Sequence, residues 1–357
     1  MLDNVEAVQH AVRSGPCVLP VGGQTKPALS RPASDDVVRI DVSGLRGIVD
    51  YDPAELTLTA LAGTPVAELD AALAEHGQYL PFDPPLAQAG ATLGGAVAAG
   101  TSGPNAYRHG GVRDFVVGVR LVDGTGRLVS GGGRVVKNAA GFDLPKLVVG
   151  SAGRLGVLVQ LTLKVFPRPR ATTTLAFALE STEAALELVG ALGRGVLDLD
   201  ALDLEPPGRV IVRLGGDPAL LDARAERLAA AVALPAQRTH GDAEAALWRG
   251  LAALDWVPEG SRLVRAGLTV RSVAAIQTVL DSAGAGARYS LGANVVWIAW
   301  PGGTPLDALD AALGARGLAG MVLTGPSHRA LLGAPGGGAF AERIRAALDP
   351  DHRFAAA

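Results

Sequence analysis

The chain has 357 residues, of which 48% are hydrophobic and 19% charged, and its formal net charge is −3 at pH 7. This length predicts two domains, the composition excludes a disordered chain, and the scattered basic residues argue against nucleic acid as a partner. The single cysteine, Cys17, excludes an internal disulfide, a cysteine-ligated zinc site and an iron–sulfur cluster held by this chain alone. No apolar run approaches the about 20 residues that span a bilayer, and residues 1–12 do not resemble a signal peptide, so we expect a cytoplasmic protein.

The first third of the chain predicts a helix followed by strands and glycine turns. Residues 1–15 repeat valines at helical spacing, and a short strand, VLPV, then ends in the turn Gly22-Gly23-Gln24-Thr25. Residues 56–64 alternate as a β-strand, and a helix is expected from Pro65 to Gly77. The segment ATLGGAVAAGTSG that comes later is poor in side-chain bulk.

Residues 114–170 predict a hairpin, a long strand and a boundary. The hairpin, DFVVGVRLVDGTGRLVSGG, turns at Asp123-Gly124, a strong turn dipeptide. A strand is expected over 157–166, and the Pro/Arg cluster at 167–170 is the expected domain boundary. We therefore predict one domain over 1–168 and a second over 169–357.

The second domain alternates predicted strands and helices in two similar sets. TLAFALE, RVIVRLGG, SRLVRAGLTV, NVVWIAW and GMVLTG have the composition of strands, and helical segments such as STEAALELVGALG and VAAIQTVLDSAG lie between them. This order predicts an α+β domain in which a pseudo-repeated sheet is covered by helices.

Three glycines spaced three residues apart, Gly150, Gly153 and Gly156, precede the long predicted strand. A dinucleotide-binding Rossmann motif needs G-x-G-x-x-G before a helix, and here both the spacing and the helix are missing. The chain contains no G-x-x-x-x-G-K-[ST] phosphate loop, and VGSAG lacks the first glycine of a hydrolase nucleophile elbow. These three functions are therefore disfavoured, and the glycines predict backbone that passes close to something bulky.

Two further glycine-rich segments support that prediction. Adjacent amides in the turn at 22–25 can form a concavity for an anion, and the segment from Thr92 to Gly100 has almost no side chains larger than alanine. Three such segments in one half of the chain predict a long ligand held mostly by backbone. A dinucleotide fits that description.

The order of these segments and their amino-acid sequences resemble those of the FAD-binding domain of the vanillyl-alcohol oxidase and p-cresol methylhydroxylase (PCMH) superfamily. Within it, LPVGGQTK, GATLGGAVAAGTSGPNAYRHGGVRDFVVGVRLVDGTG and VVKNAAGFDLPKLVVGSAGRLGVLVQLTLKVFP are similar to the FAD-binding (E) subunits of bacterial glycolate oxidase. The resemblance covers about residues 15–168. It implies an α+β fold: a two-subdomain PCMH-type FAD-binding domain, then an α+β cap domain with a helix-covered antiparallel sheet.

The resemblance also implies roles for individual residues toward FAD. The loop of the first glycine turn would bind the diphosphate through its amides, the second segment would run beside the ribityl chain and flavin ring, and the third would pass along the adenine and ribose. Two residues at the start of the predicted hairpin would hold that hairpin against the site, and the Lys-Asn-x-x-Gly-Phe-Asp run would shape the pocket. The residues implied for the diphosphate are Val21, Gly22, Gly23, Gln24 and Thr25, and those beside the ribityl chain and flavin ring are Gly90, Thr92, Gly94, Gly95, Ala98 and Gly103. Those along the adenine and ribose are Gly150, Gly153, Gly156 and Val157. The pair at the hairpin is Arg113 and Asp114, and the residues that shape the pocket are Lys137, Asn138, Gly141 and Asp143.

Three departures from the superfamily pattern change these expectations. Members that bind FAD covalently often carry a histidine in the first glycine loop, and because this chain has Gln24 we expect noncovalent FAD. The end of the chain, LDPDHRFAAA, lacks an Asn-Pro-Gly segment, which puts a C-terminal contact with the flavin in doubt. Relatives that oxidise 2-hydroxy acids carry a histidine-rich metal or base motif in the second domain, whereas His240, His328 and His352 are isolated here.

No arrangement of paired carboxylates, metal ligands or Ser/His/Asp residues stands out, so the catalytic residues are unknown. His328 is the remaining candidate for a proton acceptor and Arg329 for a carboxylate contact, although a lone loop histidine is more often solvated or capping. His109, with Tyr107 and Arg108, is open to two interpretations, a position near the flavin or hydrogen bonding within a loop. The four tryptophans, Trp248, Trp256, Trp297 and Trp300, are expected in the core or at an interface.

Three functions follow as hypotheses. The first is an FAD-binding subunit of a glycolate (2-hydroxy acid) oxidase or dehydrogenase complex, with a sister flavoprotein subunit that oxidises the substrate and an iron–sulfur subunit that carries the electrons onward. Through these partners the chain could take a peripheral position at the inner membrane face. The second is a self-sufficient FAD-linked 2-hydroxy acid or alcohol oxidase or dehydrogenase, and the third is a non-catalytic scaffold that has lost its flavin.

Overall fold

The computed structural model describes residues 1–31, 36–133, 143–334 and 336–355. Its contacts divide the chain into two compact units. Unit 1 consists of Met1–Ser102, Gly111–Pro167 and Gly336–Ala357, and unit 2 of Gly103–Gly110 and Arg168–Pro335. The division at Pro167 coincides with the Pro/Arg cluster. It differs from the predicted boundaries in two segments, because 103–110 contacts unit 2 and 336–357 contacts unit 1.

A five-stranded antiparallel sheet forms the centre of unit 1, in the strand order β3-β4-β8-β6-β7. Its strands are β3 (Ile48–Asp52), β4 (Thr57–Leu61), β6 (Val116–Val122), β7 (Leu128–Gly132) and β8 (Val157–Lys164). The predicted hairpin is β6–β7, and its turn is stabilised by the Asp123 carboxylate, which accepts bonds from the Thr125 amide at 2.9 Å and the Arg127 amide at 3.0 Å. The glycine-spaced segment therefore ends in the central strand of this sheet, as its β-branched pattern predicts.

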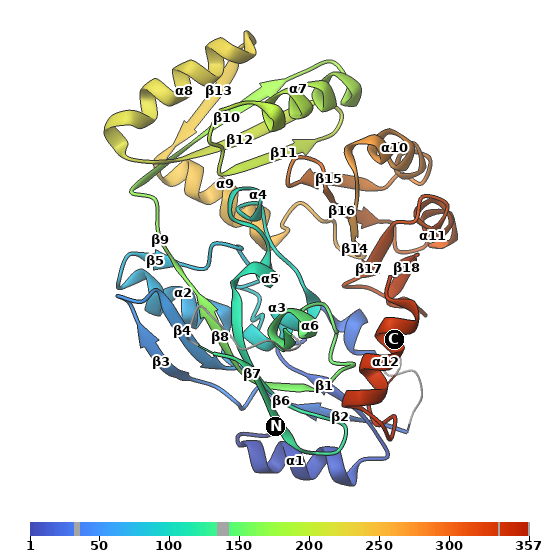
Figure 1. The fold of residues 1–357 in the computed structure, drawn as a ribbon. Helices are drawn as coiled ribbons and strands as arrows, with labels where there is room; N and C mark the ends of the chain where they lie inside the picture. The colour runs from blue at the N-terminus through green and yellow to red at the C-terminus, as the bar shows by residue number, and fades with distance from the viewer. Residues whose placement is uncertain (32–35, 134–142, 335, 356–357) are drawn as a thin grey trace. The chain divides into compact units, whose positions relative to one another are not determined.

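A second, smaller sheet in unit 1 pairs β1 (Cys17–Val21) with β2 (Val37–Asp41) in parallel. The C-terminal segment extends it, because the Val18 amide donates to the Arg353 carbonyl at 2.6 Å and the Ala355 amide donates to the Val18 carbonyl at 3.0 Å. Phe354 enters the same hydrophobic cluster as Val18 and the valines of α1 (Val5–Ser14). The end of the described chain is therefore part of the unit that contains the beginning (Figure 1).

The remaining elements of unit 1 cover these sheets. Helices α2 and α3 contribute to a hydrophobic cluster whose other members come mainly from β4, β6 and β8. The elements are η1 (Pro27–Ser30), α2 (Val66–Ala74), α3 (Leu93–Ala99), α5 (Val112–Phe115), α6 (Leu144–Val148), α12 (Gly338–Leu348) and the short pair β5 (Gln78–Tyr79) with β9 (Phe166–Pro167).

Unit 2 is built on a nine-stranded antiparallel sheet in the order β13-β10-β12-β11-β15-β16-β14-β17-β18. Its strands are β10 (Ala171–Ala178), β11 (Ala201–Glu205), β12 (Arg209–Gly216), β13 (Ala236–His240), β14 (Arg262–Gly267), β15 (Gly286–Ser290), β16 (Val295–Trp300), β17 (Ala319–Val322) and β18 (Leu331–Gly333). Its helices are α4 (Ala106–His109), α7 (Thr182–Arg194), α8 (Pro218–Val232), α9 (Gly241–Ala253), η2 (Val270–Ser272), α10 (Val273–Ser282) and α11 (Asp307–Gly314).

The sheet of unit 2 contains an internal repeat. Chain order gives β10-α7-β11-β12-α8-β13 and then β14-α10-β15-β16-α11-β17, so each half is a β-α-β-β-α-β motif. The two motifs meet at β11 and β15, where Leu204 pairs with Tyr289. Helix α7 contacts β11 and β12, and α8 contacts β10 and β12, whereas α10 contacts β15 and α11 contacts β17 and β18 (Figure 1). The predicted α+β class with a helix-covered, pseudo-repeated antiparallel sheet is confirmed.

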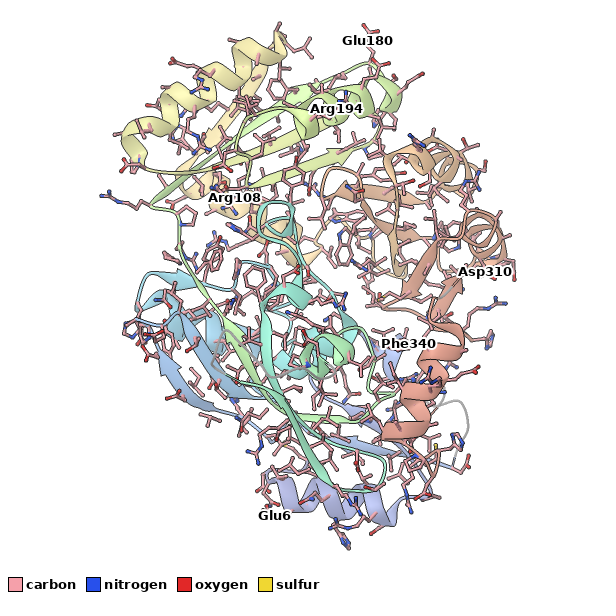
Figure 2. All side chains as sticks on the ribbon, in the orientation of Figure 1. Glu6, Arg108, Glu180, Arg194, Asp310 and Phe340 are labelled. Carbon is pink, nitrogen blue, oxygen red and sulfur yellow. The ribbon has the colours of Figure 1, made fainter. Side chains whose placement is uncertain are left out.

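Two clusters of ion pairs hold the elements of unit 2 together. Arg108 on α4, labelled in Figure 2, pairs with Asp198 and Asp200. Glu244 on α9 is 1% exposed, and its carboxylate accepts two bonds from the Arg213 guanidinium, at 2.8 and 3.2 Å. Residues 103–110 therefore belong to unit 2 through charge pairing as well as through packing.

Within the described ranges, no helix has both the length and the apolar character required to traverse a bilayer.

Candidate cofactor site

Unit 1 contains a cavity of about 690 Å³, part of which is open to solvent. Three stretches of chain supply most of its lining: the loop after β1 with the start of η1, helix α3, and the turn before β8. The lining residues are Pro20, Val21, Gly22, Gly23, Gln24, Thr25, Lys26, Leu29, Ser30, Val42, Ala62, Thr92, Gly94, Gly95, Ala98, Ala99, Ala152, Gly153, Gly156 and Leu158. The three glycine-rich segments singled out in the sequence are therefore brought together around one cavity.

The loop at 22–26 presents backbone donors to the cavity. Among the described residues, the amides of Gly22 to Lys26 donate no hydrogen bond to another part of the chain. Gln24 has a left-handed φ of 51°, a conformation that few residues other than glycine adopt. Consecutive free amides around a left-handed residue form the concave arrangement that binds anions in many proteins. This geometry suits a phosphate group.

The second segment, which the sequence describes only as rich in glycine and poor in side-chain bulk, forms the short helix α3. The Thr92 hydroxyl caps α3 by accepting from the Gly95 amide at 3.3 Å, and Gly100 ends the helix with φ of 64°. A Cβ atom on Gly94 would lie 2.8 Å from the Cβ of Ala62, so the helix needs glycine there to pack on β4 and its flank. Only small side chains, Ala98 and Ala99, project from this helix among the lining residues.

The first two segments pack closely against one another. A Cβ atom on Gly22 would lie 2.6 Å from the Thr92 hydroxyl oxygen, and one on Gly23 would lie 2.0 Å from the Gly90 carbonyl oxygen. We expected these glycines to make room for a ligand. In the structure Gly22 makes room for the Thr92 side chain and Gly23 for the backbone of Gly90, and both glycines line the cavity.

The third segment is a turn stabilised by α3. Gly150, Gly153 and Gly156 have φ values of 79°, 76° and 151°, and Ala152 between them has φ of 49°. The Gly150 amide donates to the Val97 carbonyl at 3.0 Å, and the Ala152 amide donates to the Ala98 carbonyl at 2.8 Å. The strand β8 follows, so the absence of a Rossmann helix or a nucleophile elbow at these glycines is confirmed.

Two buried cations lie at this cavity, and the sequence interpretation missed both. Lys26 lines it, is 6% exposed, and has its pKa lowered to about 8 because burial disfavours the charged amine. Arg154 is also 6% exposed and donates to the carbonyls of Ala152 at 2.6 Å and Leu29 at 3.1 Å, two residues of the lining. Its Nε has no partner among the described residues, and burial followed by the charge of Arg345 lowers its pKa. A basic residue directly after a glycine turn is the signal that could have identified Lys26.

Seven of the residues implied by the resemblance lie outside the cavity lining. Asp114 accepts from the Gly111 amide at 2.9 Å, Asp143 accepts from the Lys146 amide at 3.2 Å, and the Lys146 ammonium bonds the carbonyl of Arg113. These contacts fix α5 and α6 rather than the cavity wall. The seven are Gly90, Gly103, Arg113, Asp114, Asp143, Gly150 and Val157, of which Gly103 belongs to unit 2. Lys137, Asn138 and Gly141 lie outside the described residues.

The catalytic candidates lie in unit 2 on exposed chain. His328 and Arg329 are both exposed, and the Arg329 guanidinium pairs with Asp310 at 2.6 Å and with Asp307 at 3.9 Å. Asp310, labelled in Figure 2, lies on α11, and its carboxylate also accepts from the Gly333 amide at 2.7 Å. Burial lowers the pKa of His109, and the charge of Arg108 lowers it further. Within the described ranges no group of three His, Cys, Asp or Glu side chains is arranged to hold a metal ion. Trp248, Trp297 and Trp300 are buried, as expected for core residues.

The residues present fit a dinucleotide. The cavity combines a concave set of free amides, one ammonium group and walls of glycine and alanine, which together match an extended ligand with a diphosphate group. The amides and Lys26 could hold the anionic centre, and the side-chain-poor surfaces of α3 and of residues 152–156 could face the flat groups on either side. Among the described residues of the lining, Lys26 is the one ionisable side chain, and it could supply charge neutralisation.

Comparisons with known proteins agree with this description. Residues 2–132 match the family model described as an FAD binding domain. The glycolate oxidase subunit GlcE of Escherichia coli strain K12 is 44% identical over 184 residues, 52% of this chain and 52% of that protein. The D-2-hydroxyglutarate dehydrogenase of Xanthomonas citri pv. viticola is 30% identical over 204 residues, 56% of this chain and 43% of that protein. The chain thus spans about half the length of these relatives.

A solved structure of alkyldihydroxyacetonephosphate synthase shares the fold. It superimposes with a TM-score of 0.71 at 17% sequence identity, over 98% of this chain and 74% of that one. The fold is confirmed by this likeness, and the resemblance to FAD-binding proteins that the sequence indicated is confirmed by the family model and the relatives.

Proposed function

We propose that this chain, whose residues 2–132 belong to the FAD binding domain family, is the FAD-binding subunit of a complex that oxidises glycolate or a related 2-hydroxy acid. The observation that carries the proposal is the 44% identity to a glycolate oxidase subunit over 184 residues. The cavity supports it independently, because its free amides and buried ammonium suit a diphosphate.

FAD, when bound, supplies hydride acceptance and electron transfer. The chain contributes the rest. The amides of residues 22–25 would hold the diphosphate, and Lys26 would offset its charge. The small side chains of α3 and the turn at 152–156 would let the backbone approach the rings and exclude water from them. None of these groups moves a proton, so the proposal gives this chain the role of holding and orienting the cofactor.

The partners follow from the same reasoning. In our proposal a sister flavoprotein subunit oxidises the 2-hydroxy acid, and an iron–sulfur subunit accepts the electrons because a chain with one cysteine cannot hold a cluster alone. The chain would act in the cytoplasm and reach the inner membrane face only through those partners. The exposed position of His328 and the engagement of Arg329 with Asp310 support a chain that does not itself perform substrate oxidation.

A second candidate is a self-sufficient 2-hydroxy acid dehydrogenase, favoured by the 30% identity to D-2-hydroxyglutarate dehydrogenase. The two candidates differ in what the purified chain does alone. We expect the lone chain to contain FAD and to leave glycolate and D-lactate unchanged in the presence of an artificial electron acceptor. The complex purified with its partners should reduce the acceptor with glycolate. Turnover by the lone chain would support the second candidate, and a lone chain that takes up no flavin would contradict both.

A further inference from the structure

The amine of Lys26 has no counter-charge within the described part of the chain. The side chain is 6% exposed, and its Nζ atom contacts the Thr25 hydroxyl at 3.4 Å, which is a weak hydrogen bond to a neutral group. A buried cation of this kind costs free energy unless an anion or several acceptors stabilise it. The described residues therefore provide little electrostatic stabilisation for the charged amine of Lys26.

The position of this amine is defined by the same loop that presents the free amides. Lys26 follows Thr25 directly, and both line the cavity with Gly22, Gly23 and Gln24. The other elements around the cavity contribute Ser30 and Thr92 as polar side chains, and Arg154 stands behind the lining with its guanidinium bonded to the Leu29 and Ala152 carbonyls. Within the described part of the lining, Lys26 is thus the one side chain whose charge can change with pH.

We infer that Lys26 is a cofactor-positioning residue that neutralises the diphosphate of FAD and makes FAD affinity depend on pH. The inference rests on the proposed function, in that it takes FAD as the occupant of the cavity. A charge-assisted hydrogen bond from an ammonium to a phosphate oxygen adds to what neutral amides provide. Such a bond also explains why a lysine side chain is tolerated at this buried position.

The direction of the pH dependence follows from the pKa of Lys26 in the free chain, which burial lowers to about 8. A bound diphosphate stabilises the ammonium and raises that pKa, so binding above about pH 8 takes up a proton. Below about pH 8 the amine is already protonated and affinity is constant. Above it, the dissociation constant of FAD should rise toward tenfold per pH unit until the pKa of the complex is reached.

The test uses the full chain prepared without flavin and titrated with FAD, with dissociation constants measured from about pH 7 to about pH 9.5. Lys26→Met should bind FAD at least about tenfold more weakly at neutral pH and lose the rise above pH 8. Lys26→Arg should retain most of the affinity and also lack the rise, because arginine stays protonated over this range. Lys164→Met is the matched control, since Lys164 is exposed on β8 and outside the cavity, and it should behave as the wild type.

Stability of the flavin-free chain separates a role toward FAD from a structural one. Removing an unpaired buried cation should leave the denaturation midpoint of Lys26→Met unchanged or higher. Wild-type affinity in Lys26→Met, or a midpoint that falls together with affinity, would overturn the inference. If Lys26→Met does not fold, the test rests on comparing the wild type with Lys26→Arg. Equal slopes of the FAD dissociation constant against pH above pH 8 in these two proteins would overturn the inference. A wild-type chain that binds no FAD at any pH would instead contradict the proposed function.

Discussion

Gly23 and the Gly90 carbonyl group are in such close contact that a Cβ atom on residue 23 would lie 2.0 Å from the carbonyl oxygen. The carbonyl oxygen is a backbone atom, so an atom added at residue 23 must move backbone. The loop at 22–26 and the approach to α3 are therefore packed directly together, and the shape of the cavity depends on the absence of one methyl group.

We expect Gly23→Ala to lose FAD because the methyl group separates these segments and disturbs the amides at 22–25. The overpacking should also lower the free energy of unfolding by about 1–3 kcal/mol. The measurement is the ratio of flavin absorbance to protein in the purified chain. Gly303→Ala is the control, since a Cβ atom there would meet no described atom within 4 Å, and it should keep its flavin. Full flavin content in Gly23→Ala would show that the cofactor does not depend on this contact.

Glu244→Ala should destabilise unit 2 strongly. The carboxylate is 1% exposed and accepts bonds from Arg213 and from the hydroxyls of Thr172 at 2.8 Å and Thr174 at 3.1 Å. Its removal leaves the half-buried Arg213 guanidinium without its carboxylate partner, and breaking a buried ion pair in this way costs about 3–5 kcal/mol. Denaturant unfolding measures the change.

The matched control for that variant is Asp222→Ala. Asp222 pairs with Arg238 at the surface of the same unit, with 76% of its side chain exposed, so the loss should be about 0–1 kcal/mol. Equal losses in the two variants would mean that the burial of Glu244 does not decide its contribution.

Asp349→Ala should release the C-terminal segment from unit 1. The carboxylate is fully buried and accepts from the Arg353 amide at 2.7 Å and the Phe354 amide at 2.9 Å. Bonds to a charged acceptor contribute about 1.5–3 kcal/mol each, so we expect the unfolding free energy to fall and the two amides to exchange their hydrogens faster. Asp351→Ala, at a 61% exposed side chain, should change neither measurement. Unchanged exchange in Asp349→Ala would contradict this assignment.

The flavin should separate from the protein on acid precipitation, because Gln24 occupies the loop position where covalently flavinylated relatives often carry histidine. The supernatant should hold all of the flavin, as measured by its absorbance. A yellow pellet after washing would indicate a covalent bond and would remove the basis of this prediction.

Much of the fold was predictable because its signals are local. The Asp123 turn, the alternating residues of β8 and the helix that begins after Asn4 each depend on neighbours in sequence. Helix α3 was not predictable, because Gly94 and Gly95 have low helix propensity and the helix forms through packing on Ala62. Phe354 shows the same limit, since an aromatic residue in a polar tail gives no indication of which core it enters.

The candidate site was predictable in outline and not in detail. Backbone amides at 22–25 and small residues at 92–99 follow from the glycine and alanine content. The roles of Asp114 and Asp143 as helix caps, and the burial of Lys26 at the cavity, depend on which segments meet in space. Sequence resemblance indicates which residues lie in the region of the site. Tertiary packing determines which of them line the cavity.

The division of the chain has a consequence for its biosynthesis. Unit 1 is composed of three separate stretches, and the last of them, from Gly336, is translated after the whole of unit 2. Phe354 and the Asp349 cap can join the first strand only at that stage. A nascent polypeptide on the ribosome therefore holds unit 1 without its third stretch until all of unit 2 has been translated.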